Sequence, residues 1–135
     1  MDRKVFLDTS YAIALVVNND INHANAGALA KKLFQERTQT ITTELILIEI
    51  ADSLSKISFR HEAIGTTNKL RQLTQVIEVE KSFLQQAWSL YKNRLDKEWS
   101  MTDCYSFVVM EKYGIKQALT TDKHFEQAGF EILLK

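Results

Sequence analysis

Short apolar runs alternate with longer amphipathic segments along the whole chain, and this alternation constrains the fold more than any other feature. Five runs are predicted strands: 4–8, 40–43, 76–79, 117–121 and 130–134. Six longer segments are predicted helices: 10–18, 23–37, 44–57, 60–73, 82–95 and 102–113. Strands separated by helices indicate a parallel sheet with helices on both faces. The expected fold is α/β, a single three-layer α/β/α domain over residues 1–135 with a mostly parallel central sheet.

The composition supports one compact domain. The chain has 135 residues, 45% of them hydrophobic, which is enough for a sizeable core. It contains no proline and four glycines, and we find no linker-like stretch. Seventeen basic residues balance seventeen acidic residues, so the net charge argues against a strongly basic, nonspecific nucleic-acid binder. A local basic surface remains compatible with this balance.

The N-terminal segment and the single cysteine bear on localisation. Arg3 and Lys4 precede an apolar run, as in a signal peptide, but Asp8 interrupts that run and no small-residue cleavage site follows. No apolar stretch reaches the roughly 18 residues that a membrane span requires. Cys104 is alone, so no disulfide forms within the chain, and it is expected to be a small buried residue. We expect a cytoplasmic protein.

Two aspartates follow predicted strands directly. Asp8 ends the strand 4–8, and Asp122 follows the strand 117–121. Parallel sheets bind ligands beyond the carboxyl ends of their strands, so the two carboxylates share one crevice if these strands are neighbours. Taken singly, each aspartate is equally typical of a helix cap or of a turn.

Two further acids lie on predicted helices. Glu49 is surrounded by apolar residues, where a carboxylate is costly unless it is paired or binds a metal. Alternatively, it lies on a narrow solvent-facing stripe with Asp52 and Ser53. Asp103 follows Ser100 by three residues, which matches a capping box, and capping is compatible with metal binding. Together with Asp8 and Asp122, these acids would form an oxygen-only site that suits Mg²⁺ or Mn²⁺ rather than zinc.

Several other residues have simpler interpretations. The histidines are scattered and are expected on the surface or in loops: His23, His61 and His124. Trp88 and Tyr91 recur at helical spacing, which is more typical of core packing than of a base-stacking platform.

Four motifs resemble the acidic motifs of PIN-domain ribonucleases, and most of all those of VapC toxins from type II toxin–antitoxin pairs. They are FLDTS, TELILIEI, SMTDCYSFVVMEKYG and ALTTDKHFEQAGF, in this order. The resemblance implies an endoribonuclease that depends on Mg²⁺ or Mn²⁺. It also implies a metal site made of Asp8, Glu49, Asp103 and Asp122, with Asp8 and Asp103 as direct ligands.

The resemblance also implies supporting residues and partners. Thr9, Ser10 and Thr121 would orient carboxylates or the attacking water. Expected partners are an RNA substrate, a cognate antitoxin that lays an apolar helix in a groove, and a second copy of the chain. Without the four site acids, the chain has four more basic than acidic residues. The residues that could contact the phosphates of an RNA substrate are Arg60, Lys69, Arg71, Lys92 and Arg94.

Three alternatives remain open. The first is a PIN nuclease that processes RNA without an antitoxin. The second is a partner-binding α/β module whose acids only cap helices. The third is a phosphatase of the haloacid-dehalogenase type, which places a second aspartate two residues after the first. Here that position is Ser10, which counts against a phosphatase.

Overall fold

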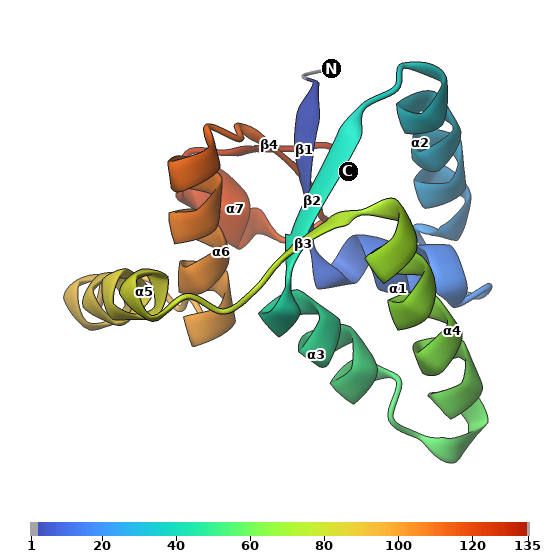
Figure 1. Ribbon diagram of the computed structural model, residues 1–135, viewed down its shortest axis with the longest axis horizontal. Coiled ribbons are helices and arrows are strands. Elements are labelled where there is room, and N and C mark those ends of the chain that lie inside the picture. Colours follow the sequence, from blue (N-terminus) through green and yellow to red (C-terminus); the bar gives the residue numbers. More distant parts are fainter. Residues whose placement is uncertain (1–2, 135) are drawn as a thin grey trace.

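The computed structural model describes residues 3–134, which form one α/β unit around a five-stranded sheet (Figure 1). Its strands are β1 (Lys4–Leu7), β2 (Gln39–Thr43), β3 (Gln75–Ile77), β4 (Gln117–Leu119) and β5 (Glu131–Ile132). They lie in the order β3-β2-β1-β4-β5, and every neighbouring pair is parallel. The α/β fold class and the parallel sheet are therefore confirmed.

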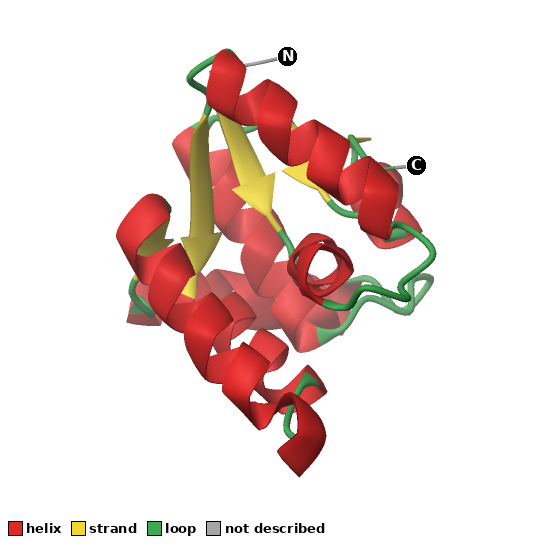
Figure 2. Ribbon diagram, turned by 90° about the vertical axis from the view of Figure 1, so that its right-hand side faces the viewer, coloured by secondary structure: helices red, strands yellow, loops and turns green. Residues whose placement is uncertain are grey.

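Seven helices cover the two faces of this sheet. They are α1 (Thr9–Val16), α2 (His23–Gln35), α3 (Glu44–Ser53), α4 (Ile57–Leu73), α5 (Lys81–Asn93), α6 (Met101–Tyr113) and α7 (Lys123–Gln127). Helices α1, α2 and α4 lie on one side of the strands, and α5, α6 and α7 lie on the other (Figure 1). Figure 2 looks from the side of α2 and α4 and shows their layer in front of the strands. None of the helices between residues 3 and 134 has the length and apolar character needed to cross a membrane.

The chain order reverses between β1 and β4, and this reversal positions the candidate site. From β1 the chain adds β2 and β3 on one side, then crosses back to add β4 and β5 on the other. Leu7 pairs with Leu119, and the N–H of Asp8 donates to the Leu119 carbonyl over 3.2 Å. The residues that follow β1 and β4 therefore meet at the switch point, where sheets of this kind bind ligands.

The core extends from the central strand to the helices on both faces of the sheet (Figure 1). Val5, Phe6 and Leu7 of the central strand are at most 2% exposed. All seven residues from Cys104 to Met110 on α6 are buried, because the sheet covers one side of this helix and α5 packs on another. The expectation that Cys104 is a small buried residue is confirmed. This packing holds the first turn of α6 rigidly beside the strand ends.

Helix termini follow the signals in the sequence. Ser100 and Asp103 form the expected capping box at the start of α6. Gly114 ends α6 with φ 66°, a left-handed conformation that glycine adopts at little cost. The segment predicted as one helix over 44–57 ends at Ser53 instead, and α4 begins at Ile57.

The expectation that Trp88 and Tyr91 pack in the core is wrong. Trp88 and Tyr91 are 48% and 44% exposed rather than buried. Helix α5 packs on α6 through a different face that carries Ala87, so the two aromatic rings contact each other at its surface instead. Of the two roles left open for Asp122, the structure shows the helix cap, because Asp122 is the N-cap of the short helix α7.

Candidate metal centre

Asp8 is the deepest acid of the candidate site. It follows β1 and is only 5% exposed. Burial raises its pKa from 3.8 to about 7, and the nearby carboxylates of Glu49 and Asp103 act in the same direction. Hydrogen bonds from the Thr120 hydroxyl and the Thr9 backbone lower the pKa and offset part of this effect. Asp8 is therefore a buried acid whose charged form the folded protein disfavours.

A chain of hydroxyl groups holds the Asp8 carboxylate. Thr120 Oγ1 donates to Asp8 Oδ2 over 2.6 Å. Because that hydroxyl proton is committed to Asp8, Ser10 Oγ donates to Thr120 Oγ1, 3.0 Å away. The backbone N–H of Thr121 in turn donates to Ser10 Oγ over 3.1 Å. Ser10 thus supports the carboxylate through Thr120, a residue that the sequence prediction missed in favour of its neighbour Thr121.

Glu49 reaches the site from α3. Its carboxylate accepts a short hydrogen bond from the Thr9 hydroxyl, and its side chain is half-buried. Helix α3 is not buried all round, because Ile48 is 53% exposed and Asp52 is exposed. Glu49 therefore lies at the boundary between that exposed stripe and the strand ends, and Thr9 positions it.

Asp103 and Asp122 meet at the imidazole of His124. His124 Nδ1 lies 3.1 Å from Asp103 Oδ2 and 3.4 Å from Asp122 Oδ1. The three side chains offer ligand atoms that all lie within 4.8 Å of one another. His124 was expected on the surface or in a loop; it lies partly exposed on α7, which turns its ring toward the acids. Its position two residues after Asp122, in TTDKHF, is the signal that could have revealed it.

The four acids thus form one electrostatic cluster with two parts. Asp103, Asp122 and His124 make the compact part, while Asp8 and Glu49 lie outside this group of three. The effect of Asp103 on the Asp8 pKa connects the two parts. Among the described residues, no lysine or arginine forms an ion pair with any of the four acids. A cation would compensate this cluster, and its carboxylate oxygens are the ligands that hard divalent ions prefer.

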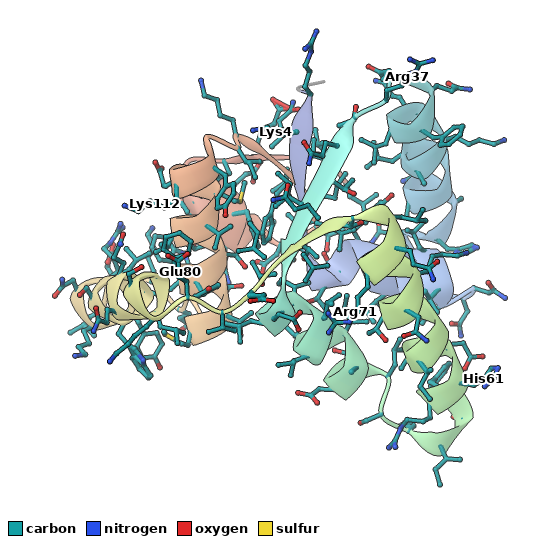
Figure 3. All side chains as sticks on the ribbon, viewed as in Figure 1. Lys4, Arg37, His61, Arg71, Glu80 and Lys112 are labelled. Carbon is teal, nitrogen blue, oxygen red and sulfur yellow. The ribbon has the colours of Figure 1, made fainter. Side chains whose placement is uncertain are left out.

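Two of the basic residues that were expected to contact RNA phosphates, Arg71 and Arg94, form ion pairs within the chain. Arg71 forms a bidentate ion pair with Glu44, with a shortest separation of 2.7 Å. Figure 3 shows the Arg71 side chain projecting from α4. Arg94 pairs with Asp96 at 2.9 Å and its guanidinium lies over the Trp99 ring. In the free chain these two arginines therefore contact neighbouring side chains of the same chain.

A groove of about 570 Å³ lies between α1 and α4. Its apolar lining includes Ala12, Leu15, Val16 and Leu70, and Lys69 contributes a basic group. The α1 side of this groove is formed by Ala12, Leu15 and Val16 of the segment SYAIALVV.

A comparison with protein families identifies the family to which this fold belongs. The PIN domain family matches residues 5–131. The chain belongs to the PIN domain family. The match covers both the strand ends and the helices that carry the four acids, and it confirms the resemblance drawn from the four motifs.

Relatives of this PIN domain include VapC proteins. The chain is 30% identical over 128 residues to the 23S rRNA-specific endonuclease VapC20 of Mycobacterium tuberculosis, covering 93% of this chain and 95% of that protein. It is 23% identical to the ribonuclease VapC1 of Aquifex aeolicus, covering 96% of this chain and 89% of the relative. The prediction of a VapC-type PIN domain is confirmed by these relatives.

Solved structures agree with this fold. The crystal structure of M. tuberculosis VapC20, described as a toxin that cleaves the sarcin-ricin loop, superposes with a TM-score of 0.82 at 29% identity and covers 93% of this PIN domain chain and 95% of its own. VapBC2 from Rickettsia felis, bound to a promoter DNA fragment, superposes with a TM-score of 0.71 at 10% identity, with coverages of 96% and 97%. At that identity the likeness supports the fold alone.

Proposed function

We propose that this chain is a VapC-type endoribonuclease that hydrolyses RNA phosphodiester bonds with Mg²⁺ or Mn²⁺. The observation that carries the proposal is the cluster of Asp8, Glu49, Asp103 and Asp122 without a lysine or arginine partner among the described residues. Such a cluster suits a divalent cation better than it suits helix capping alone. The names of the VapC relatives supply the reaction class.

Each residue of the site has its own role in the proposed hydrolysis. The bound ion would lower the pKa of a water and neutralise charge on the scissile phosphate. Asp103 and Asp122 would hold the ion, and the negative charges of Asp8, at the end of β1, and Glu49, on α3, would add to the site. Thr120 orients Asp8 Oδ2, and Thr9 orients Glu49. The expected products carry a 5′-phosphate and a 3′-hydroxyl.

Ribosomal RNA is the first substrate to test. The M. tuberculosis relative with 30% identity is named a 23S rRNA-specific endonuclease, and it covers nearly the whole chain. We therefore propose a structured loop of ribosomal RNA as the substrate class, with messenger and transfer RNA as comparison substrates.

The test is RNA cleavage by the purified chain with Mn²⁺, with Mg²⁺ and with chelator. We expect cleavage with either ion and none with chelator. Asp103→Asn should abolish cleavage, although the Oδ1 of asparagine can still accept the backbone N–H of Ser100 and so retain the capping box. Its melting temperature should therefore stay close to that of the parent. An Asp103→Asn protein that still cleaves RNA would refute the proposed site.

We also propose control by an antitoxin that lays an apolar helix in the groove between α1 and α4. The groove is apolar along α1, and α4 lines it with Leu70 and with polar residues that include Glu62 and Lys69. The chain would act in the cytoplasm as a homodimer, with the site facing a shared RNA groove. Expression of the free chain should arrest cell growth, and co-expression of the protein encoded by a neighbouring gene should relieve the arrest. Harmless expression of folded, metal-loaded protein would contradict the toxin assignment.

A further inference from the structure

We propose that His124 is a nitrogen ligand of the metal ion and that it makes this centre prefer Mn²⁺ over Mg²⁺. This inference rests on the proposed metal-dependent function and deepens it, because it assigns a fifth side chain and an ion preference to the site. The four candidate ligands taken from the sequence motifs are all acids, and acids alone do not discriminate strongly between these two hard ions.

The distances around His124 match those between ligands of a single ion. Its Nδ1 lies 3.1 Å from Asp103 Oδ2 and 3.4 Å from Asp122 Oδ1. In octahedral coordination with bonds of about 2.1 Å, atoms in neighbouring positions are about 3 Å apart and opposite atoms about 4 Å apart. The ligand atoms of all three side chains lie within 4.8 Å of one another. A divalent ion therefore fits between them with small side-chain adjustments.

The three side chains are held in place by their own helix ends. Asp122 caps α7, because its Oδ1 accepts the backbone N–H of His124 over 2.9 Å. Asp103 is fixed by its capping box with Ser100. The next residue on α7, Phe125, is fully buried and its ring packs on Phe107 at 5.0 Å between centroids. The ring of His124 is thus presented to the acids by an anchored turn.

The chemistry of the imidazole nitrogen predicts which of the two ions binds this site more tightly. Mg²⁺ prefers oxygen ligands and gives up its waters reluctantly. Mn²⁺ accepts a nitrogen ligand more readily than Mg²⁺ does, although it binds such sites more weakly than the later first-row ions. A neutral His124 that replaces one water should therefore favour Mn²⁺. A competing role exists, in which protonated His124 is only a counter-ion for Asp103. In that case a bound ion displaces it, and removing the ring should tighten binding of both ions.

Metal binding to the purified chain without RNA separates the two roles. Mn²⁺ binding is followed by electron paramagnetic resonance, and Mg²⁺ binding by competition with Mn²⁺. Pulsed measurements should detect coupling between bound Mn²⁺ and a ¹⁴N nucleus in the parent. Incorporation of ¹⁵N-labelled histidine should convert this signal to ¹⁵N coupling, a result that needs no variant.

His124→Asn retains a short polar side chain but removes the imidazole. We expect the ¹⁴N coupling to disappear and the Mn²⁺ affinity to fall at least about tenfold, the scale on which metal-site residues act. The Mg²⁺ affinity should change by less than about threefold. The matched control is His61→Asn, since His61 is exposed on the outer part of α4 (Figure 3) and should leave the ¹⁴N coupling and both affinities unchanged.

Two outcomes would overturn the inference while the proposed nuclease function stands. The first is Mn²⁺ bound to the parent without histidine nitrogen coupling. The second is a His124→Asn chain that binds both ions more tightly or loses both equally. A parent that binds neither ion would overturn the inference and the proposed function together.

Discussion

The hydroxyl of Thr120 donates a hydrogen bond of 2.6 Å to Oδ2 of Asp8, joining residues that are 112 positions apart in the chain. The bond depends on the pairing of Leu7 with Leu119, which brings the ends of β1 and β4 together. It stabilises the ionised form of Asp8, whose pKa is otherwise raised by burial. The charge available for a cation at this site therefore depends on Thr120.

Thr120→Val should weaken metal binding by raising the pKa of Asp8 further. The variant also leaves the N–H of Asp122 without its acceptor, since that N–H donates to Thr120 Oγ1 over 3.0 Å. We expect the pH at which Mn²⁺ binding is half-maximal to move upward and the free energy of unfolding to fall by about 1–3 kcal/mol. Mn²⁺ titrations at several pH values, with denaturant unfolding, measure both effects.

Thr120→Ser and Thr121→Val are the matched controls for this prediction. Serine retains the hydroxyl and should restore metal binding. Thr121 contacts the network through its backbone N–H, so its valine variant should bind Mn²⁺ nearly as the parent does. Equal losses from Thr120→Val and Thr121→Val would contradict the assignment of Thr120.

Asp8 should make the metal-free protein less stable as pH rises from about 4 to 7. An aspartate in an unfolded chain has a pKa of 3.8, and the pKa of Asp8 in the folded chain is about 7. Between these two pH values, Asp8 therefore holds a proton in the folded chain that it has released in the unfolded chain. The unfolded state then binds fewer protons, and the free energy of unfolding falls with pH. Asp8→Asn should remove this dependence and stabilise the metal-free protein at pH 8 by a few kcal/mol.

Chemical unfolding of parent and Asp8→Asn at pH 5 and pH 8, with chelator, tests this expectation. Asp52→Asn on the exposed side of α3 serves as the control and should retain the pH dependence of the parent. A parent whose stability stays flat or rises between these pH values would show that Asp8 is not held in this environment.

Divalent ions should stabilise the folded chain by neutralising the clustered acids. Saturation at 100 times the dissociation constant contributes about 2.7 kcal/mol. For a domain of this size each kcal/mol corresponds to about 2–4 °C in melting temperature. Thermal melts with Mn²⁺ and with chelator should show this shift in the parent, and Asp8→Asn and Asp122→Asn should lose most of it. Variants that keep the full shift would show that these acids do not hold the ion.

Ser106 and Thr42 should respond oppositely to removal of a buried hydroxyl. Ser106 Oγ is the one buried side-chain polar atom among the described residues without a hydrogen-bond partner. Ser106→Ala should therefore leave stability unchanged or raise it by up to about 1 kcal/mol, since alanine also favours the helix. Thr42 donates to the Leu7 carbonyl over 2.8 Å, so Thr42→Val should cost about 1 kcal/mol. Denaturant midpoints compare the two, and a clear loss from Ser106→Ala would reveal a partner for that hydroxyl.

Local patterns in the sequence determined the elements of this fold. Apolar runs of strand length, helices between them, the capping box of Ser100 with Asp103 and the left-handed Gly114 are all encoded within a few residues. Local pattern also drew attention to Asp8 and Asp122 at strand ends, whereas the set of four acids came from the resemblance to PIN-domain ribonucleases. The exposed ring of Trp88 was missed, because periodicity shows that a helix has an apolar face but not how much of it a neighbour covers.

The contacts among the site residues were decided by the tertiary structure. The pairing of β1 with β4 depends on the strand order, which no local pattern encodes, and it alone selects Thr120 rather than Thr121 as the donor to Asp8. His124 belongs to the same class, because its ring meets Asp103 only after α6 and α7 have packed together. Spacing along a chain places side chains on a face of one element. The distances that govern pKa values and metal binding arise between elements, from packing of the whole domain.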